Sequence, residues 1–292
     1  MKFPNATPRR GIATRVLSAL ALLFSAGASA SSPASVAFWY AQKPPLAELA
    51  RFDWAVVEPG HLQTEDVRTL QAMGAHPFAY LSVGEFAGND QTLADAGLSA
   101  AASAHRNHAW DSQVMDLTSP AWRNYLLQRA QHYQAQGYAG LFLDTMDSFQ
   151  LQPAARRETQ RLALVSLLQE LHKANPGLKL FFNRGFEVLP ELTDVVAAVA
   201  VESIHSGWDA SRKEYRPVPQ ADRDWLLGKL APLKQRGVPL IAIDYLPPQQ
   251  SEQATALARQ LCSEGFIPFI TTPQLDYLGA STVQLNAKNI CR

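Results

Sequence analysis

The chain has 292 residues, with 26 Lys and Arg against 26 Asp and Glu, a formal net charge of zero and 47% hydrophobic residues. This apolar content is typical of a globular protein and excludes a largely disordered chain. The balanced charge supplies no basic surface for a phosphate backbone, so we expect no nucleic-acid partner.

The first thirty residues predict a secretory signal peptide. Basic residues at positions 2, 9, 10 and 15 precede an uncharged run over residues 16–27, and Ala28-Ser29-Ala30 is a small-x-small cleavage site. That run of 12 residues is too short to cross a bilayer, which needs about 20. We expect cleavage after Ala30, which removes residues 1–30 and leaves a secreted or periplasmic protein with no membrane insertion. A retained membrane anchor is the alternative.

Cleavage would leave 292 − 30 = 262 residues, with 26 − 4 = 22 Lys and Arg against 26 Asp and Glu. This length fits a single α/β barrel, which typically has about 250 residues. The two cysteines, Cys262 and Cys291, lie near the C-terminus and can form a disulfide in an exported chain. The alternative is one buried thiol and one free terminal thiol.

Short apolar runs alternate with helix-period segments along this mature chain. The runs span residues 36–41, 54–59, 77–84, 140–145, 179–183, 198–203, 239–245 and 266–272. The helical segments include residues 64–73, 120–136, 154–174, 220–236 and 251–264. Strands that alternate with helices indicate a parallel sheet, and eight of them in one domain favour a closed barrel over an open sheet. We therefore predict the α/β fold class, with a single (β/α)8 TIM barrel over residues 31–292.

The active site of such a barrel lies at the C-terminal ends of its strands. The strand ends here are Tyr40, Glu58, Glu85, Asp144, Asn183, Glu202 and Asp244, with Asp276 just beyond the eighth run. Because side chains alternate along a strand, we expect Asp144, Glu202 and Asp244 to point into the barrel mouth. Glu58 follows Val56 by the same rule, whereas Glu85 points outward unless a bulge intervenes.

Several chemistries lack their motifs in this sequence. There is no G-x-G-x-x-G after a strand, no G-x-x-x-x-G-K-[ST] and no G-x-S-x-G. His105 and His108 fall in a predicted loop, where we expect solvated side chains rather than zinc ligands. We expect neither a metal nor a cofactor.

What remains is a set of carboxylates accompanied by aromatic residues, as glycosidic cleavage requires. We select Asp144 and Glu202 as the catalytic pair, because an acid that ends an apolar strand usually has a task or a partner. A helix N-cap or an acid that braces a loop is the alternative role of Asp144. Tyr40, Tyr80, Trp110, Trp208 and Tyr245 are candidates for stacking on sugar rings, with core packing as the alternative. Glu58, Glu85, Asp147, Asn183 and Asp244 complete the expected substrate-binding set.

The segment over residues 137–148, which includes Phe142-Leu143-Asp144-Thr145, resembles glycoside hydrolase family 114 when taken together with Glu202. This family consists of endo-α-1,4-polygalactosaminidases and includes a hydrolase domain that trims a bacterial exopolysaccharide. The resemblance extends from about Ala37 to Tyr277. It implies a (β/α)8 barrel that cuts partly deacetylated galactosamine polymers, with Asp144 and Glu202 as the catalytic pair. By analogy with other barrel α-glycosidases, Asp144 is assigned as the nucleophile and Glu202 as the general acid/base.

The expected charge of the mouth fits that substrate, because deacetylated galactosamine is an ammonium ion at neutral pH. A ring of acids would focus a negative potential on it; this ring comprises Glu58, Glu85, Asp144, Asp147, Asp244 and Asp276. Two other readings remain open, namely a noncatalytic barrel that binds a cationic exopolysaccharide and a glycosidase that acts on a neutral α-glycan. We expect a monomer whose partner is a galactosamine-containing polysaccharide.

Overall fold

The computed structural model describes residues 32–99, 103–279, 281 and 291. The predicted signal peptide, residues 1–30, lies outside the described residues, so its cleavage stays a prediction. Within the described ranges, the structure has no helix that is long and apolar enough to span a membrane.

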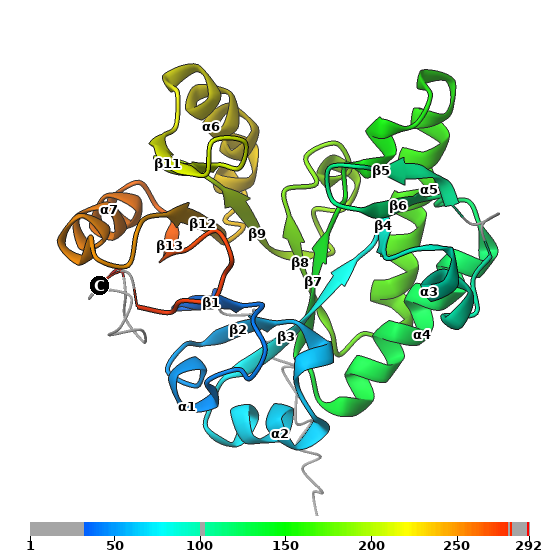
Figure 1. The fold of residues 1–292 in the computed structure, drawn as a ribbon, viewed down its shortest axis with the longest axis horizontal. Coiled ribbons are helices and arrows are strands. Elements are labelled where there is room, and N and C mark those ends of the chain that lie inside the picture. Colours follow the sequence, from blue (N-terminus) through cyan, green and yellow to red (C-terminus); the bar gives the residue numbers. More distant parts are fainter. Residues whose placement is uncertain (1–31, 100–102, 280, 282–290, 292) are drawn as a thin grey trace, which may run out of the picture. The chain divides into compact units, whose positions relative to one another are not determined.

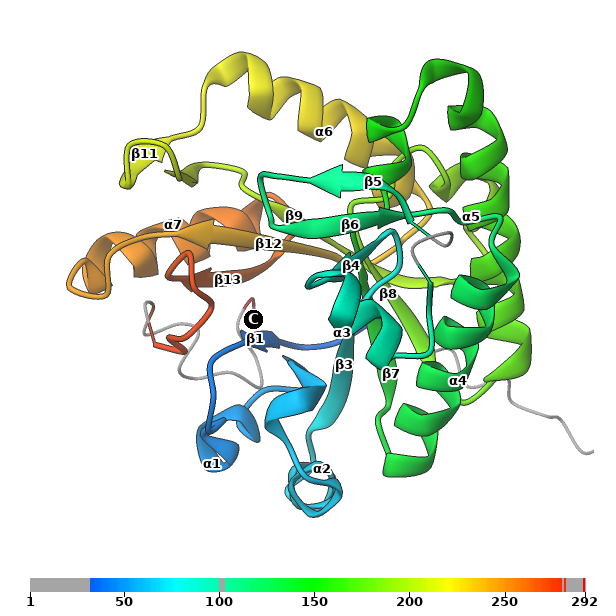
Figure 2. The same ribbon diagram turned by 45° about the vertical axis from the view of Figure 1, so that its right-hand side comes forward.

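Eight parallel strands form the central sheet (Figures 1 and 2). In sheet order they are β1 (Val36–Trp39), β2 (Trp54–Val57), β3 (His76–Ser82), β7 (Gly140–Asp144), β8 (Lys179–Asn183), β9 (Val196–Glu202), β12 (Leu240–Tyr245) and β13 (Ile267–Thr271). Just beyond β1, the backbone N–H of Tyr40 donates to the carbonyl of Leu275, beyond β13, at 2.9 Å. The fold is a (β/α)8 TIM barrel, and all eight predicted strands are confirmed.

The five predicted helices are also confirmed, and they lie outside the strands (Figure 1). They are α2 (Thr64–Ala72), α4 (Pro120–Gln136), α5 (Ala154–Ala174), α6 (Gln220–Gln235) and α7 (Ser251–Ser263). α4 illustrates their signals, because Pro120 occupies its first turn and Gly137 ends it in the left-handed conformation, at a φ of 98°. Shorter helices are α1 (Leu46–Leu49), α3 (Asp90–Asp95) and the 3-10 turns η1 (Pro59–His61), η3 (Ser148–Leu151) and η4 (Leu189–Glu191).

Two small antiparallel sheets at the strand ends were not predicted. One joins β4 (Glu85–Ala87), β6 (Ser112–Met115) and β5 (Ser103–Asn107), and the other joins β10 (Ser206–Asp209) to β11 (Glu214–Pro217). Their strands are short and largely polar, so they lack the apolar alternation that reveals a strand. His105 lies in β5, so its predicted loop position is wrong.

Aromatic rings fill the barrel interior, where branched aliphatic residues are usual. The ring centroids of Phe38 and Phe142 lie 5.1 Å apart, and those of Phe78 and Phe181 lie 5.9 Å apart. Both pairs meet edge to face, the geometry that aromatic quadrupoles favour. Each ring comes from a different strand, so this contact set fixes which face of each strand points inward.

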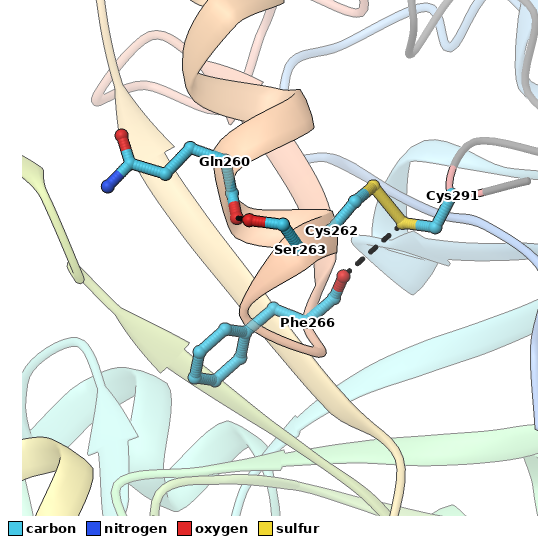
Figure 3. Close-up of a disulfide and its surroundings, with 5 residues drawn as sticks. All are labelled: Gln260, Cys262, Ser263, Phe266 and Cys291. Atoms are coloured by element: carbon cyan, nitrogen blue, oxygen red, sulfur yellow. Dashed lines mark hydrogen bonds between the residues drawn. A yellow bond between two sulfur atoms is a disulfide. The ribbon is translucent and has the colours of Figure 1, made fainter.

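A disulfide joins Cys262, near the end of α7, to Cys291 (Figure 3). The predicted bridge is confirmed, and the alternative of two free thiols is wrong. The sulfur of Cys291 also lies 3.4 Å from the carbonyl oxygen of Phe266, which precedes β13. The bridge therefore attaches position 291 to the junction between α7 and β13.

Candidate active site

Strand register decides which strand-end side chains face the barrel interior. Ser82 pairs with Asp144, Asn183 with Ala200, and Ile243 with Glu202. Paired residues of parallel strands point to the same face, and residues two apart on one strand share it. Applied around the barrel, this rule puts seven side chains at the mouth: Tyr40, Glu58, Tyr80, Asp144, Asn183, Glu202 and Tyr245.

A cleft of about 510 Å³, called here the central cleft, opens at this mouth. Eight residues selected from the sequence line it: Tyr40, Glu85, Trp110, Asp144, Asp147, Asn183, Glu202 and Tyr245. Asp147 is exposed, and Trp110 is 80% exposed. Arg184 also lines this cleft and was missed, because it follows a strand end rather than forming one.

Asp144 is held on both of its carboxylate oxygens. The hydroxyl of Tyr80 donates to one oxygen at 2.8 Å, and the side-chain amide of Asn183 donates to the other at 2.8 Å. Tyr80 and Asn183 thus hold this acid in place, while their expected part in substrate binding stays a prediction. Asp147, not Asp144, occupies the N-cap position of η3, so the N-cap alternative for Asp144 is wrong.

The backbone next to Asp144 is constrained. Thr145, a β-branched residue, has a φ of 58°, a conformation that such residues rarely adopt. Its hydroxyl lies 2.7 Å from the carbonyl oxygen of Asp144 and accepts the backbone N–H of Gly84 at 2.9 Å. A Cβ on Gly84 would lie 2.2 Å from the carbonyl oxygen of Thr145, so only glycine permits this approach.

Glu202 ends β9 and is held differently. The hydroxyl of Tyr245 donates to its carboxylate, and the guanidinium of Arg184 donates to its backbone carbonyl. Burial raises the pKa of Glu202 and the negative charge of Asp144 raises it further, while Tyr245 and Arg184 act in the opposite direction. The site thus places a carboxyl of raised pKa beside a carboxylate with two hydrogen-bond donors.

Glu85 does not point outward as strand parity predicted. β3 ends at Ser82, and the chain turns at Gly84 before Glu85 begins β4. Only 5% of Glu85 is exposed, and its carboxylate accepts from Ser112, Ser148 and Asn107. These three donors satisfy it, so it braces the wall of the central cleft.

Asp244 does not point into the mouth, and that prediction is wrong. Register puts Ile243 on the same face as Glu202, so Asp244 faces away from the interior. It is fully buried and accepts the backbone N–H groups of Ile204, His205 and Ser206 at 2.7–2.8 Å. Asp244 therefore fixes the loop that follows Glu202 and does not line the central cleft.

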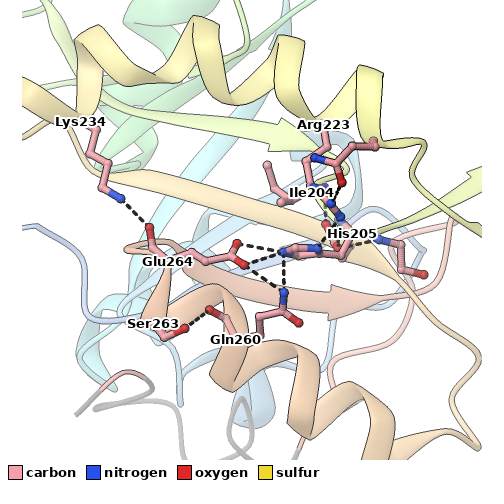
Figure 4. Close-up of polar contacts among 10 residues, drawn as sticks. Ile204, His205, Arg223, Lys234, Gln260, Ser263 and Glu264 are labelled. Carbon is pink, nitrogen blue, oxygen red and sulfur yellow. Dashed lines mark hydrogen bonds and ion pairs between the residues drawn. The ribbon is translucent and has the colours of Figure 1, made fainter.

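The same loop is held from outside through His205 (Figure 4). Its Nε2 lies 2.8 Å from the carboxylate of Glu264, which also accepts from Gln260 at 3.0 Å. Arg223, on α6, approaches Nδ1 of His205 at 3.3 Å. The segment after Glu202 is thus attached to both α6 and the end of α7.

Three other residues selected from the sequence, two acids and one tryptophan, do not line the central cleft. Glu58 faces the interior, where burial raises its pKa, but it does not line the central cleft. Asp276 accepts from Thr272 at 2.5 Å and is exposed outside that cleft. Trp208 lines a second cleft instead. In the described parts of the chain, no three His, Cys, Asp or Glu side chains gather in a way that could hold a metal ion.

This second cleft, called here the side cleft, has a volume of about 620 Å³. It shares Arg184, Glu202 and Tyr245 with the central cleft. Its remaining wall comes from β10, β11 and α6, and includes Trp208, Asp209, Arg216, Asp222 and Trp225. Asp222 and Trp225 were missed because they lie on a helix, and strand-end reasoning does not reach helix surfaces.

Comparison with known proteins identifies the family of this chain. The family model described as glycoside-hydrolase family GH114 matches residues 21–286. The chain belongs to this family. The GH114 chain is 62% identical to the glycoside hydrolase domain of PelA from Pseudomonas aeruginosa, with a TM-score of 0.82, over 85% of this chain and 99% of that one.

Two other solved structures extend the comparison. A variant of that PelA domain, in which one glutamate is replaced by alanine, is 61% identical with a TM-score of 0.81, over 85% of this chain and 99% of that one. Ega3 from Aspergillus fumigatus is 14% identical with a TM-score of 0.62, over 83% of this chain and 91% of that one, and shares the fold. No curated protein matches. The GH114 chain is thus a glycoside hydrolase.

Proposed function

We propose that this GH114 hydrolase cuts α-1,4 linkages within partly deacetylated galactosamine polymers and is exported to the periplasm or the medium. The observation that carries the proposal is the pair Asp144 and Glu202 in one cleft, held by different partners. A two-carboxylate glycosidase needs two acids whose pKa values differ. Burial and the charge of Asp144 raise the pKa of Glu202, which favours the protonated form that a general acid needs.

Glu202 is assigned as the general acid and Asp144 as the nucleophile. In the first step Glu202 gives its proton to the glycosidic oxygen while Asp144 attacks the anomeric carbon, so the leaving chain departs as an alcohol. In the second step Glu202 takes a proton from water, which attacks the glycosyl–Asp144 ester and regenerates both groups. Tyr80 and Asn183 orient Asp144 for attack through its two oxygens.

The charge of the central cleft supports an amino-sugar substrate. Besides the general acid Glu202, three carboxylates line it, from Glu85, Asp144 and Asp147, against the single guanidinium of Arg184. Fixed negative charge in a cleft favours an ammonium ligand over a neutral one. Ega3, which shares the fold, has been solved in complex with galactosamine.

The two clefts support cleavage within a chain rather than at its end. Both have Glu202 in their walls, so the general acid lies where they meet. A polymer that occupies both clefts would place an internal linkage beside this carboxyl.

The test is product analysis by mass spectrometry after incubation with three polymers. We expect the purified protein to cut deacetylated and partly acetylated α-1,4-galactosamine polymers into oligomers, and to leave a neutral α-galactan intact. A Glu202→Gln variant is the matched control for a contaminating hydrolase. Cleavage of the neutral glycan at an equal rate would overturn the substrate assignment. The intact mass of the exported protein, measured separately, tests whether its N-terminus lies at Ser31 as expected.

A further inference from the structure

The side cleft and the central cleft differ in which member of the acid pair they contact. The central cleft is lined by both Asp144 and Glu202, whereas the side cleft is lined by Glu202 but not by Asp144. The nucleophile must approach the anomeric carbon of the sugar that stays on the enzyme. The general acid must reach the oxygen between that sugar and the leaving chain, so it lies at the boundary between them.

From this difference we infer that the side cleft holds the leaving-group end of the polymer, where Trp225 and Asp222 bind one amino sugar. The inference rests on the proposed function and adds a direction to it. The sugar that forms the covalent intermediate occupies the central cleft, and the reducing-end part of the chain lies along β10, β11 and α6.

Trp225 is the exposed tryptophan of the side cleft, whereas Trp208 in the same wall is half-buried and meets Tyr215 edge to face at 4.9 Å. The side chain of Trp225 is 54% exposed, although tryptophan is usually largely buried. Two groups contact its ring: Phe186 meets it edge to face at 5.9 Å, and the ammonium of Lys229 lies over it, 5.7 Å from the ring centroid. A positioned, exposed indole in a cleft with polar groups is typical of a ligand site, and its π-face also attracts a cation.

Asp222 supplies the charge. It lies three residues before Trp225 on α6, a spacing that puts two side chains next to each other on one helix face. The neighbouring Arg216 is already paired with Asp209 at 3.0 Å. Throughout the described ranges, no side chain donates to the Asp222 carboxylate. An ammonium on a sugar that stacks on Trp225 would find this carboxylate beside it.

The experiment maps cleavage positions in galactosamine oligomers that carry a fluorescent label at the reducing end. In Trp225→Ala, we expect kcat/KM to fall about tenfold for oligomers long enough to reach the side cleft. Labelled products should become shorter as cleavage moves toward the reducing end. Trp225→Phe should restore most of the loss. Leu227→Ala, on the same helix but outside the side cleft, should behave as the wild type.

Asp222→Asn tests the charge, and Asp224→Asn is its matched control. Asp224 lies on the same helix, outside both clefts, and accepts from Gln220 at 2.6 Å. With partly acetylated oligomers, the wild type should favour an unacetylated sugar at one fixed position on the labelled fragment. Asp222→Asn should lower that preference about threefold, and Asp224→Asn should keep it.

The same substitutions can also be compared without turnover. Each is combined with Glu202→Gln, and the binding of galactosamine oligomers is measured by calorimetry. Wild-type cleavage positions after Trp225→Ala, or labelled products that become longer, would overturn the inference. If the wild type cut no galactosamine oligomer at all, the proposed function would fail instead, so the two failures are distinct.

Discussion

Tyr245 donates its hydroxyl to the carboxylate of Glu202, and strand register brings the two together. Glu202 pairs with Ile243 across β9 and β12, so Tyr245 lies on the same face, two residues further along its strand. A hydrogen bond to the ionised carboxylate lowers the pKa of Glu202, against the larger effect of burial, which raises it. Tyr245 therefore helps to determine the pKa of Glu202, and with it the pH range in which Glu202 is protonated.

We expect Tyr245→Phe to move the basic limb of the kcat/KM profile to higher pH. Removal of the donor leaves burial and Asp144 to raise the pKa of Glu202, so the general acid keeps its proton to a higher pH. The shift should be up to about one pH unit. The measurement is a pH–rate profile on a galactosamine oligomer. Tyr40→Phe is the control, because no hydrogen bond joins Tyr40 to Glu202. A limb that stays in place or moves to lower pH would contradict the assignment of Glu202 as the acid.

Sequence alone predicted every barrel strand and the strand-end side chains of the central cleft, because apolar runs, helix periods and strand ends are local signals. It failed at Asp244 because residue size does not reveal which face points inward. In β9 the small Ala198 and Ala200 share the interior face with Glu202, but in β12 the interior residue is the larger Ile243 and the small Ala242 faces out. The register with the neighbouring strand shows which face of β12 points inward, and the sequence of a single strand does not determine that register.

A change of leaving group should distinguish the roles of Asp144 and Glu202. With a polymer, Asp144→Asn and Glu202→Gln should each lower kcat by at least about a hundredfold. With an aryl galactosaminide whose phenol leaves without protonation, Glu202→Gln should keep the release of the first equivalent of phenol, whereas Asp144→Asn should lose it. Stopped-flow absorbance of the phenol reads both. The reverse pattern would exchange the two roles.

Glu202→Gln should also stabilise the fold at neutral pH. The folded-state pKa of Glu202 is raised above the ordinary value of 4.5, so native-state stability is lost as pH rises through that folded pKa. A neutral glutamine avoids this loss, which amounts to about 1.4 kcal/mol for each unit by which the pKa is raised. Urea unfolding at pH 4 and pH 7 measures it. The gain should be present at pH 7 and should vanish below the unfolded-state pKa; a gain that is equal at both pH values would rule out ionisation as its cause.

Asp244→Asn should weaken the loop that follows Glu202. The carboxylate of Asp244 accepts three backbone N–H groups, and an amide offers one acceptor oxygen and turns its NH₂ toward donors. We expect the free energy of unfolding to fall by about 2 kcal/mol and kcat to fall with it. Urea unfolding and steady-state kinetics measure the two effects. Asp276→Asn is the control, because Asp276 is exposed. An unchanged kcat would separate this loop from catalysis.

Loss of the disulfide should lower stability without touching the chemistry. The bond from Cys262 to Cys291 spans a sequence separation of 29. Closing such a loop lowers the entropy of the unfolded chain and thereby stabilises the fold by about 3 to 4 kcal/mol. A variant in which both cysteines are replaced by serine should therefore unfold at a lower urea concentration. Its kcat should stay the same, because neither cysteine lines the central cleft or the side cleft. Alkylation of the wild type without reductant should label neither cysteine. Two labelled thiols would show that the bridge does not form.

Salt should discriminate between deacetylated and acetylated ligands. In the Glu202→Gln variant the central cleft keeps the carboxylates of Glu85, Asp144 and Asp147 against one guanidinium, so an ammonium sugar gains an attraction that a neutral N-acetyl sugar lacks. Between 0.1 M and 1 M salt the screening length falls from about 10 Å to about 3 Å. Binding of deacetylated oligomers to the Glu202→Gln variant should weaken several-fold over this range, because each partly exposed charge pair contributes up to about 1 kcal/mol. Fully acetylated oligomers serve as the matched control and should bind with nearly constant affinity. Equal salt dependence for the two ligands would mean that hydroxyl contacts and ring stacking, rather than charge, select the substrate.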